Sequence, residues 1–120
     1  ILLTILTISL TGFTQTDLSI SICDLKESKP NITSLTINQL FECGELSANN
    51  KNYIIFSYTA TMNAAGVIKK AMVSGNKFSD KLITFLKEAT PEKIYFERIV
   101  LIDKDGKKMS GQHHTVKIKT

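Results

Sequence analysis

The sequence has 120 residues, enough for one domain with a modest core and too few for two. Hydrophobic residues make up 42% and charged residues 22%, which excludes an intrinsically disordered chain and a membrane protein with several spans. The net charge is +4, and every basic residue except Arg98 is a lysine. Nucleic-acid binders usually interleave arginines with aromatic side chains, so we expect no nucleic-acid partner.

The chain begins with an uncharged apolar run, Ile1 to Leu10, and carries no charge before Asp17. This length suits the apolar region of a signal peptide and falls short of the roughly 20 residues that span a bilayer. We therefore predict a signal peptide over residues 1–14, with cleavage before Gln15; a longer membrane anchor that begins upstream is the alternative. The missing initiator Met and basic segment predict that this signal is truncated at its start.

Cleavage would leave a single domain over residues 15–120 with no stable membrane insertion. We expect this domain in the periplasm, or secreted and at the cell surface. Export places Cys23 and Cys43 in an oxidising compartment, where two thiols can pair. Two interpretations stay open, a disulfide or a Cys43 packed as a small apolar side chain at the end of a helical turn.

The sequence pattern of the N-terminal half predicts short strands and one short helical turn. Alternating apolar residues at Leu18, Ile20 and Ile22 predict an edge strand. A second strand is expected over 35–37, followed by a short helical turn near 38–42. We expect Asn38 to cap this turn, Gly44 to end it in the left-handed conformation, and residues 47–52 to form a loop.

The strongest strand pattern runs from Tyr53 to Asn63. Strict alternation assigns one face of this strand to the core and the other to the exterior. The predicted core face comprises Ile54, Phe56, Tyr58, Ala60 and Met62. Residues 67–73 alternate as well and predict a more exposed strand protected by its lysines, followed by a turn at Gly75-Asn76.

A helix is predicted near 79–89. Ser79 precedes an apolar set spaced for one helix face, and Pro91 follows its end. The apolar set comprises Leu82, Ile83, Phe85 and Leu86. A β-rich run over 94–102 and a strand over 115–119 follow, joined through Asp105-Gly106, which supplies the positive φ of a hairpin turn. The whole pattern predicts a mainly β (α+β) domain.

No residue pattern points to catalysis or to a cofactor. His113 and His114 are adjacent, so on a strand they point to opposite faces, and we expect surface histidines. The serines lack the Gly-x-Ser-x-Gly setting of a nucleophile, and the segment after Asp103 lacks the ligands of a calcium loop. The cysteines lack the spacing of a metal site. We expect a protein that is not an enzyme and holds no metal or other cofactor.

Four segments together carry a family resemblance. These are the short helix 38–44 ending in glycine, the long strand 53–62, the Asn76-Lys77-Phe78-Ser79 start of a helix, and the closing run from Ile94 through Asp105-Gly106 to Lys119. By these segments, residues 37–120 resemble the C-terminal domain of the GldM/PorM family, the periplasmic arm of the gliding-motility and type IX secretion motor of Bacteroidetes. The chain departs from the family at Glu88 to Pro91, where a Lys-x-Gly is usual, and at Lys107 to Met109.

The resemblance implies an antiparallel, β-sandwich-like fold and binding to other envelope proteins, such as secretion or motility components. It transfers no ligand residues, because that domain of the family is not catalytic. The predicted partner surface is the hairpin tip with the exposed lysines of the last strand. It comprises Asp105, Gly106, Lys107, Lys108, Lys117 and Lys119.

A second hypothesis is a small-ligand or glycan-binding β-sandwich domain. Tyrosine rings are common contacts for such ligands because they combine an apolar face with a polar hydroxyl. Tyr53, Tyr58 and Tyr95 are the three candidates, although each can equally be a structural residue of its strand.

Overall fold

The computed structural model describes residues 18–23 and 31–119. The predicted signal peptide and its cleavage site lie outside these residues. Neither of the two described helices is long and apolar enough to span a bilayer.

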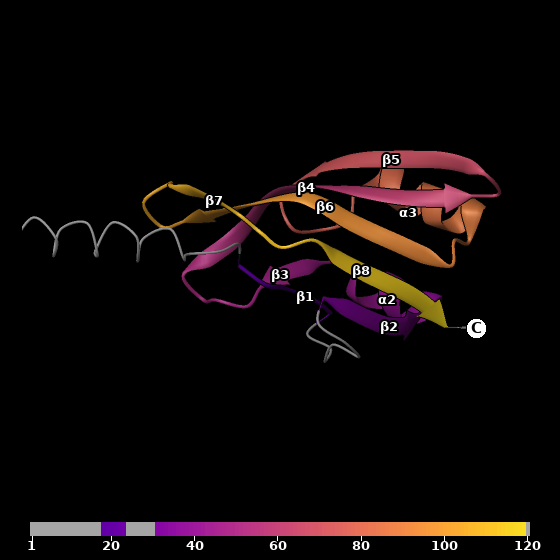
Figure 1. Ribbon diagram of the computed structural model, residues 1–120, viewed down its shortest axis with the longest axis horizontal. Helices are drawn as coiled ribbons and strands as arrows, with labels where there is room; N and C mark the ends of the chain where they lie inside the picture. Colours follow the sequence, from indigo (N-terminus) through magenta and orange to yellow (C-terminus); the bar gives the residue numbers. More distant parts are fainter. Residues whose placement is uncertain (1–17, 24–30, 120) are drawn as a thin grey trace, which may run out of the picture.

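The domain is mainly β, as predicted, and contains two sheets (Figure 1). The larger sheet has the strand order β2-β8-β6-β4-β5, with β7 paired to one end of β6. The smaller sheet consists of β1 and β3. Strands β2 and β8 run parallel, whereas all other neighbouring strands are antiparallel. The elements are β1 (Ile20–Ile22), β2 (Ile32–Thr36), α2 (Ile37–Cys43), β3 (Leu46–Ala48), β4 (Tyr53–Ala64), β5 (Val67–Ser74), α3 (Asp80–Ala89), β6 (Lys93–Asp103), β7 (Lys108–Ser110) and β8 (His114–Lys119).

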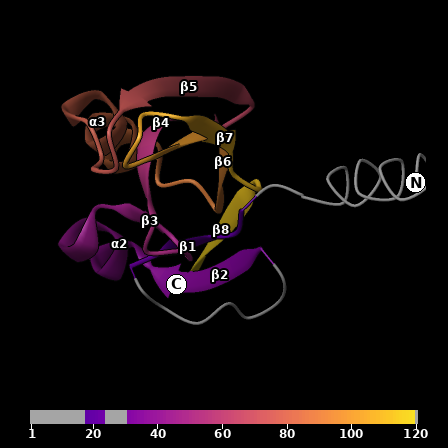
Figure 2. The same ribbon diagram turned by 90° about the vertical axis from the view of Figure 1, so that its left-hand side faces the viewer.

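The larger sheet curves around the core, and both helices lie on its inner side (Figure 2). Leu40 from α2 and Leu82 and Leu86 from α3 are fully buried there. Ile20 and Ile22 of β1 are fully buried too, which confirms the alternation predicted for that strand. The opposite face of β4, β5 and β6 therefore has no helix over it among the described residues.

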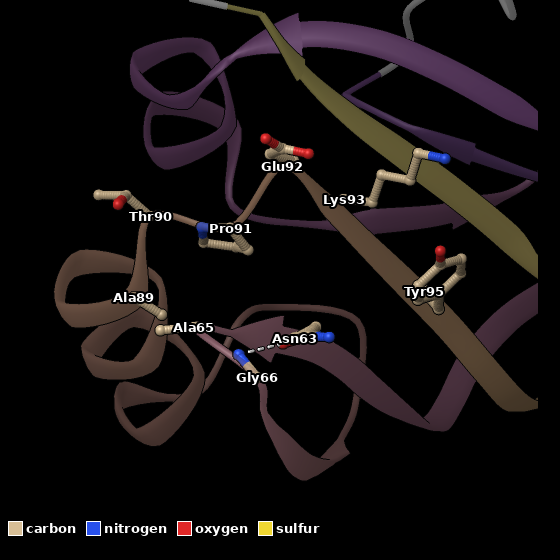
Figure 3. Close-up of a pocket in the computed structure, with 9 residues that line it drawn as sticks. All are labelled: Asn63, Ala65, Gly66, Ala89, Thr90, Pro91, Glu92, Lys93 and Tyr95. Carbon is tan, nitrogen blue, oxygen red and sulfur yellow. Dashed lines mark hydrogen bonds between the residues drawn. The ribbon is translucent and has the colours of Figure 1, made fainter.

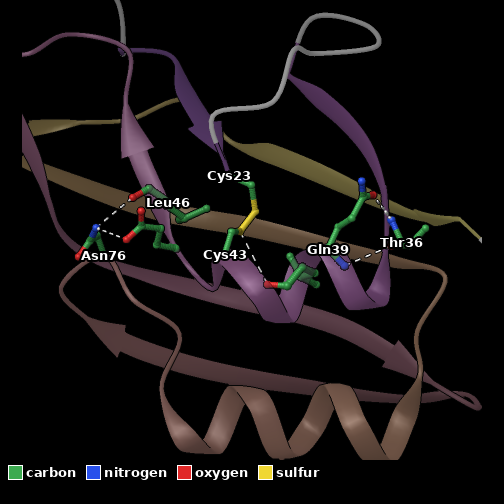
Figure 4. Close-up of a disulfide and its surroundings, with 8 residues drawn as sticks. Cys23, Thr36, Gln39, Cys43, Leu46 and Asn76 are labelled. Carbon is green, nitrogen blue, oxygen red and sulfur yellow. Dashed lines mark hydrogen bonds between the residues drawn. A yellow bond between two sulfur atoms is a disulfide. The ribbon is translucent and has the colours of Figure 1, made fainter.

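Both helices have local signals for their ends. Ser79 caps α3, accepting a hydrogen bond from the Leu82 amide at 3.2 Å, which confirms the predicted start. Gly44 ends α2 with φ of +55°, also as predicted. The cap expected at Asn38 is wrong. Thr36 caps α2 instead, because its side chain and that of Gln39 each bond the other's backbone amide (Figure 4), and Ile37 is thereby helical.

The face assignment of β4 is wrong for its first half. Ile54 is 67% exposed and Phe56 43% exposed, whereas Ile55 is buried. The register explains the change: Ile55 and Ser57 pair with the consecutive residues Leu101 and Val100, so Phe56 is an extra residue in β4. Such a β-bulge shifts the alternation by one residue, and the predicted faces hold only from Tyr58 onward.

A second bulge lies in β6 close to the first. Ser57 and Thr59 pair with Val100 and Glu97, which leaves one extra residue in β6. Arg98 lies in this stretch and has φ of +49°, the left-handed region that a side chain with a Cβ rarely adopts. The two bulges face each other across the ladder, so the overall register of β4 and β6 is restored after both.

The C-terminal hairpin differs from its prediction. The predicted turn at Asp105-Gly106 is confirmed. Asp103 Oδ1 accepts hydrogen bonds from the backbone amides of Asp105 and Lys107, each at 2.9 Å. However, this turn joins β6 to the short strand β7, which was not predicted. The chain then passes Gly111, where a Cβ would lie 2.9 Å from Ile99 Cγ2, before β8 begins. Glycine permits this close crossing from β7 to β8.

Two further expectations are corrected by pairing between distant segments. Residues 47 and 48 belong to β3 rather than to a loop, because they pair with β1. His114 is 1% exposed rather than on the surface, and its Nε2 lies 2.8 Å from Thr33 Oγ1 in a hydrogen bond. The neighbouring His113 is exposed as expected.

The two cysteines form a disulfide that ties the end of β1 to the end of α2 (Figure 4). Their Cα atoms lie 5.4 Å apart, within the usual range for a disulfide. The pairing of β1 with β3 brings Cys23 here, and its amide bonds the Glu45 carbonyl at 3.4 Å. Of the two interpretations that the sequence left open, the structure has the disulfide.

We expect the double variant Cys23→Ser/Cys43→Ser to lose about 3 kcal/mol of unfolding free energy. The crosslink closes a loop of 20 residues in the unfolded chain, and opening that loop restores its conformational entropy. Urea unfolding of the variant and of the oxidised protein measures the difference. Reductant should lower the stability of the wild type to that of the variant and leave the variant unchanged. Equal stability of the oxidised protein and the variant would contradict the expected role of the crosslink.

Candidate functional site

The predicted partner surface is divided between two ends of the molecule. Residues 104–108 form the exposed tip of the β6–β7 hairpin. Lys117 and Lys119 lie on β8 near the C-terminus, at the other end of the long axis (Figure 1). The structure therefore keeps Asp105, Gly106, Lys107 and Lys108 together and separates them from the two lysines of β8.

The three candidate tyrosines do not gather either. Tyr58 is buried in the core, and its hydroxyl donates to the Lys77 carbonyl at 3.1 Å. Its burial raises the pKa of the Tyr58 hydroxyl well above the ordinary value, so the group stays neutral. Tyr53 pairs with Asp103 and Tyr95 pairs with Thr61, so these two rings lie toward opposite ends of the β4–β6 ladder.

One hollow of about 440 Å³ lies beside Tyr95, between the β4–β5 turn and the link from α3 to β6 (Figure 3). Its walls are turns, small side chains and the adjacent Glu92 and Lys93. The Asn63 side chain accepts a hydrogen bond from the Gly66 amide at 2.9 Å, so it stabilises the β4–β5 turn. Small-molecule sites are usually lined by apolar and aromatic side chains, and this hollow has Tyr95 as its one aromatic wall.

A more distinctive surface lies on the open face of the large sheet, at the two bulges. We call it the bulge face and define it by residues from three neighbouring strands: Phe56, Ser57, Thr59, Met72, Glu97 and Arg98. Two adjoining hollows of about 240 and 210 Å³ are both lined by Thr59, Met72 and Arg98. The register places Thr59 directly opposite both Met72 and Glu97, so these side chains share one face.

Apolar side chains are unusually exposed on the bulge face. Met72 is 85% exposed and Phe56 is 43% exposed. Ile68 of β5 lies on the same side of the sheet and is 58% exposed. Lys108 from the hairpin places its Nζ 4.6 Å from the centroid of the Phe56 ring. The hairpin tip predicted as a partner surface thus adjoins the bulge face through Lys108.

The charges on and around the bulge face are mainly positive. Arg98, Lys70 and Lys81 line the smaller hollow together with one carboxylate, Glu97. Among the residues that the structure describes, the one ion pair joins Lys69 to Glu88, at 3.9 Å. Arg98 makes no side-chain hydrogen bond or ion pair with any described residue, so its guanidinium is available to a ligand.

The bulge face presents its cations and apolar groups to the solvent. The described residues bring together no group of three or more His, Cys, Asp or Glu side chains that could hold a metal ion. Neither Met72 nor Arg98 was singled out from the sequence. The signal was present in Ile54-Ile55-Phe56, because three consecutive apolar residues in a strand supply both faces and are compatible with a bulge.

No protein-family model matches this chain, and no curated protein matches it.

We expect Arg98→Gly to unfold with a free energy about 1 kcal/mol higher than that of Arg98→Ala. Both variants remove the guanidinium, but alanine keeps the Cβ that disfavours φ of +49°, whereas glycine adopts this conformation readily. Urea unfolding of the two purified variants gives the comparison. If Arg98→Ala is as stable as Arg98→Gly, the backbone at the second bulge is not strained.

Proposed function

We propose that this chain is an exported, non-enzymatic protein-interaction module of the bacterial cell envelope, which binds a partner protein at its bulge face. The observation that carries the proposal is the exposure of Met72, Phe56 and Arg98 together on one uncovered face of the sheet. Soluble proteins seldom leave large apolar side chains clustered on the surface without a binding role.

The residue types on this face support a protein partner. Aromatic residues, methionine and arginine are enriched in protein–protein interfaces, and aromatic residues and arginine are also common among the residues that dominate binding energy. Methionine is flexible and polarisable, which helps it fit an irregular partner surface. An arginine without an internal partner can form bidentate bonds to a carboxylate.

The strain at Arg98 supports the same site. Residues held in sparsely populated backbone conformations cluster at functional sites, and β-bulges re-aim the side chains next to them. Here the bulges direct Phe56 and Arg98 away from the core.

Export is supported by the disulfide between Cys23 and Cys43, because such crosslinks persist in oxidising compartments. The signal-like run at residues 1–14 points the same way. A connection to type IX secretion or gliding motility is supported by the resemblance to the GldM/PorM family alone. Envelope components of that kind are therefore the partners we propose to test first.

The alternative of a glycan or small-ligand domain is less well supported. Of its three tyrosines, Tyr95 alone borders the largest of the hollows described above. The bulge face, by contrast, unites exposed apolar and cationic groups from β4, β5 and β6.

A photoreactive amino acid such as p-benzoylphenylalanine at Met72 tests the proposal. In envelope extracts of a type IX-secreting bacterium, we expect it to give a discrete crosslinked protein, because the side chain at position 72 would lie inside the interface. The same residue at Glu42, exposed on α2 away from this face, is the matched control and should give no such adduct.

Adding Arg98→Ala to the Met72 crosslinking protein should reduce the yield of the adduct. Two results would count against the bulge face as the binding site. One is an equal yield of adduct from positions 42 and 72, and the other is a yield from position 72 that does not change when Arg98 is replaced.

A further inference from the structure

Strand β5 is the last strand of the large sheet at one side. Its inner edge pairs with β4 along its whole length, from Val67 to Ser74. No strand among the described residues pairs with its outer edge, which lies at the top of Figure 1. An exposed edge of 8 residues with apolar side chains is a template for another strand.

The β4–β5 turn determines which backbone groups face outward. Ala65 and Gly66 form a two-residue loop with φ of +53° and +87°, and Ala64 pairs with Val67 across it. In such hairpins the two residues that flank the loop form a hydrogen-bonded pair. Along the ladder, hydrogen-bonded pairs then alternate with pairs that are not hydrogen-bonded. The N–H and C=O groups of Ile68, Lys70 and Met72 consequently point to the free edge.

The same three residues also carry side chains on the bulge-face side. Ile68 is 58% and Met72 85% exposed, and Lys70 is exposed as well. A strand added at this edge would therefore gain backbone hydrogen bonds and, at the same time, side-chain contacts with the bulge face.

The charges near the outer edge of β5 determine which kind of segment can pair with it. Lys70 lies within the strand, and Lys81 of α3 and Arg98 of β6 line the same hollow as Lys70, together with one acid, Glu97. Strand β4 separates Arg98 from β5, so Lys70 is the cation on the edge strand itself. Lysines on an edge strand disfavour pairing with another copy of the same basic edge. A segment that carries carboxylates would instead be attracted, with acidic side chains facing Lys70.

We propose that β5 receives an extended, acidic segment of a partner protein as a further antiparallel strand of the large sheet. This inference rests on the proposed function and specifies how the partner binds. Backbone hydrogen bonds to Ile68, Lys70 and Met72 supply affinity, and the cations beside the edge supply the preference for acidic sequences.

A peptide as long as β5, with alternating glutamate and valine and blocked ends, is the probe. Amide hydrogen exchange measured by NMR should slow about tenfold or more at Ile68, Lys70 and Met72 when this peptide saturates the protein. Exchange at Lys69 and Ala71 should not change, because their amides already face β4. A peptide with lysine in place of glutamate should produce no such protection.

The variant Lys70→Glu should weaken binding of the acidic peptide about tenfold or more by reversing the charge at the edge. The matched control is Lys119→Glu, which makes the same change in net charge at an exposed position of β8 and should leave binding unaffected. Both positions are on the surface, so both variants should fold.

Three results would overturn the inference: protection at residues other than this alternating set, equal binding of the acidic and basic peptides, or protection of the edge in the protein alone at high concentration. The last result would indicate pairing with a second copy. These outcomes differ from failure of the proposed function, since crosslinks from Met72 to an envelope protein could persist without strand addition at β5.

Discussion

Two facing β-bulges determine which side chains of this sheet reach the core. Ile55 and Tyr58 are both buried in β4, although residues three apart on a regular strand point to opposite faces. Phe96 and Ile99 in β6 have the same spacing and the same burial. One extra residue in each strand resolves both conflicts and restores the register between them. Burying one large apolar side chain contributes roughly 1.5–3 kcal/mol, which outweighs the roughly 1–2 kcal/mol that a left-handed arginine costs.

The same bulges connect the core to the outer surface. The extra residues have no place in the ladder, so Phe56 and Arg98 lie on or beside the open face. Arg98 lines two hollows there together with Met72 of β5. The helices, β1 and the disulfide hold the inner face closed. Among residues 18–23 and 31–119, no helix covers the opposite face and no strand pairs with the outer edge of β5. Backbone groups, apolar side chains and cations therefore meet along one border of the sheet, which is the combination that strand-adding recognition uses.

Local signals predicted much of the fold. The Ser79 cap with its apolar spacing gave α3, Gly44 gave the end of α2, and Asp105-Gly106 gave the hairpin turn. One error was local, since Thr36 rather than Asn38 caps α2. The other corrections named here, and the open choice for the cysteines, depend on partners far away in the sequence. The exposed Ile54 and buried Ile55 follow from pairing with β6. The burial of His114 and the pairing of the cysteines depend on contacts with β2 and on the β1–β3 ladder. Ile54-Ile55-Phe56 is compatible with a bulge in β4, but the bulge face is assembled from three strands, and the sequence alone does not give the register that brings their side chains together.

The central claim is that the left-handed backbone at the second bulge serves folding, whereas the Arg98 guanidinium that it carries serves binding. The most direct measurement is the affinity of Arg98→Gly for the envelope protein captured through position 72, compared with the affinity of the wild-type protein. The account predicts a loss of about tenfold or more, the range expected when an interface arginine is removed, in a variant that stays folded. Wild-type affinity in Arg98→Gly would contradict the account.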